Sequence, residues 1–535
     1  MGNKKFNLTK LALAMGVTLG LSGCFSDNDN NIDFKPPEEE KPVIIEVPTN
    51  DSPEALSFFV KASIVDATAE NLTVVPNATV KFFEGGVAST NITDIDGNEV
   101  AELSAANGTL SFNVKEDADI TSVTVMVSAE GYFDKTAVVE FGEKDAVVDT
   151  LITLAKTDTL VVKEETATAA GGKLAEDLTS KTADDSVTVA ISADIELQDE
   201  NGEAVTGEEI TLTVVTAPLE AEEGKASAID VIPQGFAEVA SDDAAIIAEP
   251  AGYVEVTMSS GDTEIKNFDA PITITTTVNG DYAEGDKFAI TSFDEDTGVW
   301  TKEENEATLG AGNVMTFPAT FETDHLTGFL LTRSKAVCDV PVTYTVTGSD
   351  IPSSGLYLAL RSKAFFKSVQ ITESTGTVVS QADLKAASVA KDEIVTATLF
   401  DANDFEYANV ETTNLCGEIE IAATAPTADL VDETLPMTFS CSNADVDDQL
   451  PLGGAVVTYA QEGKIPLVAE ESAAGSYALN GLVNGATYNV TVNTRIEGFT
   501  VETFTITAGS TAATNVVRDN CETEEREVTG TGGQG

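Results

Sequence analysis

Short runs of apolar and β-branched residues, separated by turn residues, fill the chain from Leu56 almost to its end. Residues 123–127 read Val-Thr-Val-Met-Val and residues 210–215 read Ile-Thr-Leu-Thr-Val-Val. Such runs alternate at period two or are continuously apolar, which is typical of strands, and helical periodicity is nearly absent. The pattern therefore predicts an all-β chain made of several β-sandwich domains of immunoglobulin-like or transthyretin-like kind in tandem.

The first residues follow a different pattern. A short basic segment carrying Lys4, Lys5 and Lys10 precedes an apolar run over residues 11–21. The run is too short to span a bilayer as a permanent helix, and a basic start followed by such a run is typical of a secretory signal. We expect residues 1–23 to be removed on export.

The sequence Leu21-Ser22-Gly23-Cys24 behind this run resembles the lipobox of bacterial lipoproteins. The resemblance implies cleavage before Cys24 and a covalent diacylglycerol and N-acyl chain, such as palmitate, on that cysteine. Phe25 follows in place of an Asp that would retain a lipoprotein at the inner membrane, which implies transport to the outer membrane of the cell envelope. Whether the protein faces the periplasm or the cell surface stays open.

Residues 24–55 are polar and then interrupted by prolines at positions 36, 37, 42, 48 and 53. This composition predicts a disordered tether between the lipid and the folded part, and residues 522–535 predict a disordered tail. The whole chain has 90 acidic and 29 basic residues and a formal net charge of −61. Such a surface repels nucleic acid and anionic headgroups, so the expected partners are the membrane, through the lipid anchor, and an unidentified protein or glycan ligand.

Four cysteines remain besides Cys24, at positions 338, 416, 441 and 521. Pairing in sequence order, Cys338 with Cys416 and Cys441 with Cys521, closes two loops of similar size, and the other two connectivities stay open. Without any Cys-x-x-Cys spacing, neither a zinc site nor a thioredoxin-like site is indicated.

Residues 56–156 resemble the carboxypeptidase regulatory-like, or transthyretin-like, β-sandwich. The resemblance is carried by residues 76–80, the turn at 93–97, and the Ala129-Glu130-Gly131-Tyr132 ending. A second copy is expected over residues 426–521, from Gly454-Ala455-Val456-Val457 to Glu497-Gly498-Phe499. The resemblance implies scaffold or binding modules without chemistry of their own.

Residues 186–334 resemble a β-sandwich of bacterial surface proteins and of cartilage intermediate layer protein, related in its last strands to GAIN domains. The matching segments are 193–207, 296–300 and His325-Leu326-Thr327-Gly328-Phe329. Residues 157–185 before it are expected to be a linker, and residues 335–425 after it a further β-rich domain.

His325 is the only histidine in the chain. By the GAIN resemblance it would act as the base, Thr327 as the nucleophile and the Leu326–Thr327 bond as the cleavage site. Thr323 and Phe321 stand where self-cleaving GAIN domains carry cysteines. We therefore expect an intact chain in which His325 is structural and Trp300 and Phe329 fill the core.

Two aspartate-rich turns are weaker candidates for calcium, because alternate carboxylates can converge on a hard cation. Neither has EF-hand spacing, and ordinary turns account for both. Their candidate ligands are Asp94, Asp96, Asp294 and Asp296.

No G-x-S-x-G turn is present, and a single Trp gives little support for a glycan-cleaving cleft. The prediction is a non-enzymatic outer-membrane lipoprotein without cofactors, displaying binding or structural β-sandwich modules. A domain that cleaves its own Leu326–Thr327 bond is the alternative, and a carbohydrate-active accessory protein is a weaker one.

Overall fold

The computed structural model describes residues 43–48, 53, 56, 59–68, 72–115, 117–141, 147–220, 222, 224–239, 243, 245–313, 315–442, 449–495, 501–518 and 523–528. The signal peptide, Cys24, residues 24–42 of the predicted tether and Cys521 lie outside these residues. Residues 43–48 of the predicted tether and 523–528 of the predicted disordered tail form strands, so the prediction of disorder is wrong there. The fold is all-β, as predicted, with strands β1 to β40 arranged in several sheets in tandem. In the described residues, no helix has the length and apolar character needed to cross a membrane.

The first module is a sandwich of two sheets packed around one apolar core. Its core includes Phe82 and Phe112, whose rings meet edge to face at 5.0 Å. One sheet has the order β10-β2-β7-β5 and the other β4-β3-β8-β9, with β6 beside β3. The strands are β2 (Phe59–Asp66), β3 (Ala78–Glu84), β4 (Val87–Ala88), β5 (Ile92–Thr93), β6 (Glu102–Ala105), β7 (Thr109–Val114), β8 (Ser122–Ser128), β9 (Lys135–Glu140) and β10 (Val147–Leu154).

The second module is a sheet of 13 strands. Ile210 of β16 and Val187 of β14 lie far apart in the strand order but share one core, so the sheet curls over itself into a sandwich. The main order is β12-β11-β16-β17-β23-β20-β21-β22-β19-β14-β13. The strands are β11 (Val161–Ala170), β12 (Lys173–Leu174), β13 (Leu178–Lys181), β14 (Val187–Ile191), β15 (Leu197–Gln198), β16 (Glu209–Thr216), β17 (Ile246–Ser260), β18 (Thr263–Ile265), β19 (Asn267–Asn279), β20 (Lys287–Asp294), β21 (Val299–Leu309), β22 (Thr316–His325) and β23 (Gly328–Ala336).

The expected linker over residues 157–185 is wrong. It begins with a single 3-10 turn, η1 (Thr157–Thr159), and then contributes β11, β12 and β13 to the second module. β11 pairs with β16 over eight residues, from Val161↔Thr216 to Thr168↔Glu209. Its side chains alternate only between half-buried and exposed until Ala169, because it pairs at the margin of the sheet. A strand with so little burial accommodates Lys, Glu and Thr, so its sequence lacks the apolar alternation of a core strand.

A segment between β16 and β17 carries two one-turn helices, α1 (Ala228–Val231) and α2 (Phe236–Val239). Ser227 caps α1 in a capping box with Asp230, whose carboxylate accepts bonds from the Ser227 amide and hydroxyl. Residues of this segment form a core with Trp300 and Phe293 of the second module and Ala155 from the end of the first. The segment therefore fills the space between these modules.

The third and fourth modules are again sandwiches of two sheets. In the third, β27-β24-β30 faces β26-β25-β28-β29 around one core. Its strands are β24 (Val342–Thr347), β25 (Leu356–Arg361), β26 (Phe366–Ile371), β27 (Thr375–Val379), β28 (Ile394–Phe400), β29 (Glu406–Asn414) and β30 (Glu418–Ala422). The fourth contains β31 (Leu430–Cys441), β32 (Leu450–Pro451), β33 (Val456–Ala460), β34 (Leu467–Val468), β35 (Glu470–Ala473), β36 (Ser476–Val483), β37 (Thr487–Asn493), β38 (Glu502–Thr507) and β39 (Thr514–Arg518).

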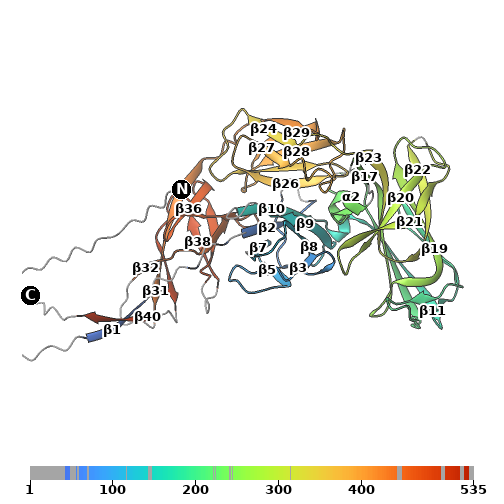
Figure 1. Cartoon of the computed structure of the whole chain (residues 1–535), viewed down its shortest axis with the longest axis horizontal. Coiled ribbons are helices and arrows are strands. Elements are labelled where there is room, and N and C mark those ends of the chain that lie inside the picture. The colour runs from blue at the N-terminus through green and yellow to red at the C-terminus, as the bar shows by residue number, and fades with distance from the viewer. Residues whose placement is uncertain are drawn as a thin grey trace, which may run out of the picture.

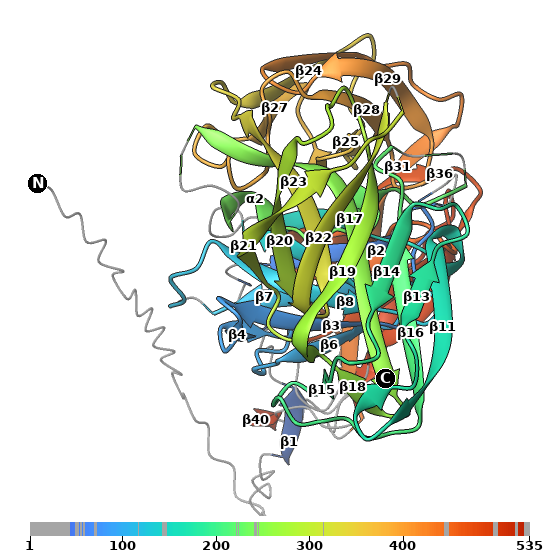
Figure 2. The ribbon, with the colours of Figure 1, turned by 90° about the vertical axis from the view of Figure 1, so that its right-hand side faces the viewer.

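The two ends of the described chain meet in a ribbon, where β1 (Val43–Pro48) pairs antiparallel with β40 (Thr523–Val528). This ribbon lies at one end of an elongated molecule, and the second module lies at the other end (Figure 1). The broad face of the second module, with β22 and β19 side by side, is seen in the turned view (Figure 2). The terminal ribbon and the largest sheet therefore lie at opposite ends of the molecule.

Candidate functional site

The proposed base and nucleophile of self-cleavage lie on either side of the β22–β23 turn. The Thr327 hydroxyl donates to the Phe293 carbonyl and, at 2.9 Å, to Oε1 of Glu295. The Gly328 amide donates to the same carboxylate oxygen. No hydrogen bond joins the His325 ring to Thr327, both of which are described. The hydroxyl is therefore held by groups other than the expected base.

The His325 ring lies among acidic side chains. Its Nε2 is 3.5 Å from Oε1 of Glu303, and its Nδ1 is 3.2 Å from Oδ1 of Asp324. The hydrogen bond with Glu303 raises the pKa of His325 against the opposing effect of burial, and Asp324 adds to the rise. These contacts favour a protonated ring fixed at the end of β22. Phe329 and Trp300 are buried in the core, as expected.

Both aspartate-rich turns are closed by their own backbone. Oδ1 of Asp94 accepts the amides of Asp96 and Asn98 at 3.0 and 2.8 Å, and Oδ1 of Asp294 accepts the amides of Asp296 and Thr297. These are Asx turns, in which the first carboxylate serves the turn itself. Among the described residues, no group of three His, Cys, Asp or Glu side chains is arranged to hold a metal ion.

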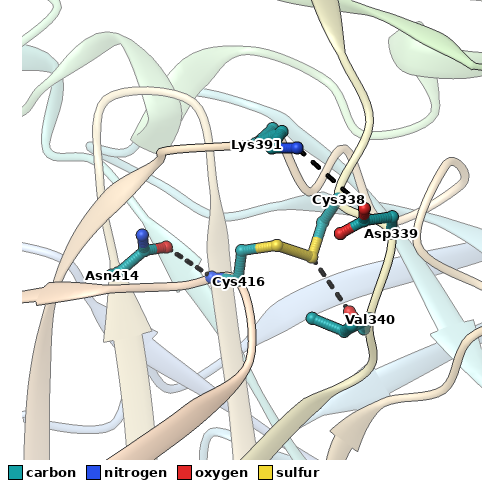
Figure 3. The surroundings of a disulfide bond; sticks show 6 residues. All are labelled: Cys338, Asp339, Val340, Lys391, Asn414 and Cys416. Carbon is teal, nitrogen blue, oxygen red and sulfur yellow. Dashed lines mark hydrogen bonds and ion pairs between the residues drawn. A yellow bond between two sulfur atoms is a disulfide. The ribbon is translucent and has the colours of Figure 1, made fainter.

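The predicted Cys338–Cys416 disulfide is confirmed, with a Cα–Cα distance of 5.6 Å (Figure 3). It ties the start of the third module to the end of β29. Cys441 is also disulfide-bonded. Its expected partner Cys521 lies outside the described residues, but the register places Cys441 opposite Arg518 of β39, three residues before Cys521. The Cys441–Cys521 pairing stays a prediction.

A cavity of about 370 Å³ lies between the first and second modules. Strands β3 and β8 and the start of β9 line one side, and Pro233 and strands β17 and β20 line the other. Aromatic rings form much of its wall, and five charged side chains reach it. The aromatic residues are Tyr132, Phe133, Tyr253 and Phe293, and the charged ones are Lys81, Asp134, Lys135, Glu255 and Glu295.

Glu255 has the most perturbed carboxyl group in this cavity. Its Oε2 accepts a hydrogen bond of 3.0 Å from the buried Tyr253 hydroxyl. Burial, together with the charges of Glu295 and Asp134, raises the pKa of Glu255 to about 7. Burial also raises the pKa of Asp134. Titratable groups perturbed in this way inside a cavity are typical of functional sites.

The two lysines differ in how they are held. Lys135 is buried, and its ammonium donates to the Ile229 carbonyl of α1 at 2.5 Å. Burial lowers the pKa of Lys135 to about 8. Lys81 lies at an exposed position of β3. In the described part of the chain, neither lysine forms an ion pair with Glu255.

Sequence reasoning missed this cavity, although one signal was present. Glu255 stands between Val254 and Val256 in a long, largely apolar strand, and an acid at such a position is costly unless it is paired or hydrogen-bonded. Asp134 and Glu295 come from other strands, so nothing in the sequence joined them to Glu255.

Buried charges also join the modules. Lys61 of β2 lies 2.6 Å from Asp149 of β10, and its ammonium donates to the Pro466 carbonyl of the fourth module and to the Tyr357 hydroxyl of the third. Glu249 of the second module, 1% exposed, pairs with Arg333 and Lys335 of its own module and with Lys363 of the third.

No family model matches the chain, and no curated protein matches it. Among solved structures, it is similar to the TIE protein of Bacillus anthracis, with 11% identity, a TM-score of 0.13, and coverage of 69% of this chain and 58% of that one. A putative membrane-associated protein of unknown function from Bacteroides fragilis gives 9% identity and a TM-score of 0.14, covering 53% of this chain and 99% of that one. The pilus backbone of Streptococcus pneumoniae gives 12% identity and a TM-score of 0.12, covering 51% and 94%. Likenesses at these TM-scores say nothing about what this chain binds or does.

Proposed function

We propose that this chain is a non-catalytic outer-membrane lipoprotein that holds its β-sandwich modules as one continuous body and displays the cavity between the first two modules. The anchor is supported by the signal-like residues 1–23 and the lipobox ending in Cys24. The display of the cavity is supported by the buried contacts that hold the modules together.

The observation that carries the proposal is the position of Lys61. Its side chain is fully buried, and one ammonium group contacts the first, third and fourth modules at once. Leu151 and Val65 on the outer face of the first module also belong to the core of the fourth. Modules joined only by flexible linkers do not share a buried charge, because solvent enters between them.

Two further ion pairs reach the third module from the second. Arg361 of β25 lies 2.7 Å from Asp230 of α1, and Lys363 lies 3.4 Å from Glu249. A third pair, Lys367 with Glu140 at 2.6 Å, joins the third module to the first. The third module is therefore bound to both the first and the second module, between which the cavity lies.

The ribbon of β1 and β40 places the end of the tether beside the C-terminal strand. A lipid on Cys24 would therefore hold the ribbon end toward the membrane and leave the second module, at the far end of the molecule, pointing away from it (Figure 1). Such an arrangement suits a protein that presents a site at a distance from the bilayer.

Membrane fractionation of cells that express Cys24→Ala tests the anchor. We expect the wild-type protein in the outer-membrane fraction and the variant either soluble or unprocessed. A variant that matures and fractionates with the outer membrane would refute the anchor. Protease added to intact cells then reports the face, because only a surface-exposed body is digested without breaking the envelope.

A further inference from the structure

We infer that the cavity between the first and second modules binds a primary ammonium group carried on a short aliphatic chain, with Glu255 and Glu295 as its anionic partners. This inference rests on the proposed function only in taking the cavity as the displayed site. It adds the chemical class of the ligand.

Glu255 has acceptor capacity that the protein does not use. A carboxylate offers about four acceptor positions. Among the described residues, the Tyr253 hydroxyl is the only hydrogen-bond donor to Glu255, and it bonds to Oε2. The other oxygen, Oε1, accepts no hydrogen bond from the described residues, and the half-buried side chain lines the cavity. A donor group on a ligand can therefore take the place of water at this oxygen.

The charge around Glu255 favours a cation. Glu295 lines the same cavity, and its Oε1 is already taken by Thr327 and Gly328. Lys266 is 3.6 Å from Oε2 of Glu295 but forms no ion pair with Glu255. The mutual repulsion of Glu255, Glu295 and Asp134 is therefore only partly neutralised, and an entering cation would relieve it.

The two lysines of the cavity do not make it a site for an anionic ligand. Lys135 has its ammonium bound to the Ile229 carbonyl. Lys81 lies at an exposed position, and its charge acts on Asp134, where it opposes the rise in pKa that burial causes. An anionic ligand would have to displace the first of these contacts and approach three carboxyl groups. A cation meets the carboxyl groups directly.

The walls suit an aliphatic stem. Phe293 and Tyr253 belong to the second module, and Tyr132 and Phe133 to the first, so apolar ring surface faces the cavity from both sides. Aromatic faces also attract ammonium groups. A volume of about 370 Å³ lies at the small end of the range for ligand sites, which fits a lysine-sized group and excludes a polymeric glycan.

Binding of the ligand should release a proton from Glu255. Glu255 must be ionised to pair with an ammonium group, and its pKa is raised to about 7 by burial and by Glu295. A bound cation stabilises the ionised form, so Glu255 releases its proton on binding. Affinity should then increase as the pH rises through about 7. The groups that face Glu255 are Tyr253, Glu295, Asp134 and Lys266.

The test is ligand-observed NMR on the full mature protein in detergent, with butylamine as the probe and butan-1-ol as its neutral counterpart. Butylamine stays protonated at both about pH 6 and about pH 8, as a lysine side chain does. We expect butylamine to bind, more tightly at the higher pH, and butan-1-ol to bind much more weakly. Glu255→Gln should weaken butylamine binding roughly tenfold or more, because it removes a charged hydrogen bond. Glu209→Gln, at an exposed position of the neighbouring strand β16, should leave it unchanged.

A peptide with one internal lysine separates the two sources of the ammonium group. Binding of the peptide together with butylamine identifies a protein partner, and binding of butylamine alone identifies a small amine; both support the inference. It is overturned if butylamine does not bind, if butan-1-ol binds equally well, or if folded Glu255→Gln binds as wild type. A failed fractionation test of Cys24 leaves this measurement untouched, so the two proposals fail separately.

Discussion

Lys61 and Asp149 are register partners on the adjacent parallel strands β2 and β10, and their side chains form an ion pair of 2.6 Å that is almost completely buried. Both side chains point away from the core of the first module. Lys61 reaches Tyr357 and Pro466 in two other modules, and the Tyr357 hydroxyl donates to Asp149 at 3.0 Å. All three protons of the ammonium group thus have acceptors. Such a network fixes how the modules dock, because a shifted interface leaves a buried charge unpaired.

Glu249 should make the junction between the second and third modules sensitive to acid. Although burial opposes the shift, hydrogen bonds from Arg333 and Lys335 lower the pKa of Glu249. A lowered pKa in the folded state contributes stability above the unfolded value of 4.5, and that stability is lost as the pH falls through the folded value. Glu249→Gln should therefore destabilise the protein at neutral pH and have little effect at about pH 2. Thermal unfolding across this range measures it, and equal destabilisation at both ends would contradict the assignment.

The raised pKa of Glu255 predicts a dependence of stability on pH that is opposite to that of Glu249. Its folded pKa is raised from 4.5 to about 7, so the folded state is favoured at low pH and loses stability as the pH rises between these values. The loss amounts to at most about 3 kcal/mol. Glu255→Gln should remove this dependence and be more stable than wild type at about pH 8. Denaturant unfolding followed by fluorescence of Trp300, which packs 5.1 Å from Phe293, reports on this module. A variant less stable than wild type above pH 7 would refute the prediction.

The Leu326–Thr327 bond should remain intact. An N-to-O acyl shift needs a free hydroxyl beside a deprotonated base, and here the Thr327 hydroxyl donates to Phe293 and Glu295 while the pKa of His325 is raised. Purified protein should give one band on a denaturing gel, unchanged in His325→Ala and Thr327→Ala. Two fragments in wild type that are absent from both variants would establish self-cleavage.

Cys441 and Cys521 should be found linked in a non-reducing peptide map. The parallel pairing of β31 with β39 brings Cys441 to the end of β39, and Cys338 is already bonded to Cys416. Replacing Cys521 by Ser should cost about 2–5 kcal/mol of stability, since the bond closes a long loop. Recovery of a Cys24–Cys441 peptide would contradict the pairing.

The sequence predicted what local patterns determine. Period-two alternation in segments such as residues 123–127 identified the all-β class, and cysteine order identified the Cys338–Cys416 bond. It failed for β11, a marginal strand whose half-buried positions include Lys163 and Glu165. Pairing with β16, and not apolar burial, makes that segment a strand.

The cavity could not be predicted because it exists only after docking. Asp134 belongs to the first module, whereas Glu255 and Glu295 belong to the second, and no sequence pattern relates them. Lys61 shows the same limit. From the sequence, Lys61 is expected on the exposed face of β2. It is buried only because the third and fourth modules cover that face.

Small-angle X-ray scattering of the mature protein tests most directly whether the modules form one body. The buried Lys61 network predicts a wild-type profile that fits a single elongated particle with the arrangement in Figure 1. Lys61→Met should loosen this particle, because an unpaired buried Asp149 costs about 3–5 kcal/mol, and the double variant Lys61→Met with Asp149→Leu should restore it. Lys115→Met, at an exposed pair with Glu99, is the matched control and should not change the profile. A wild-type profile typical of modules moving independently on linkers would contradict the central claim.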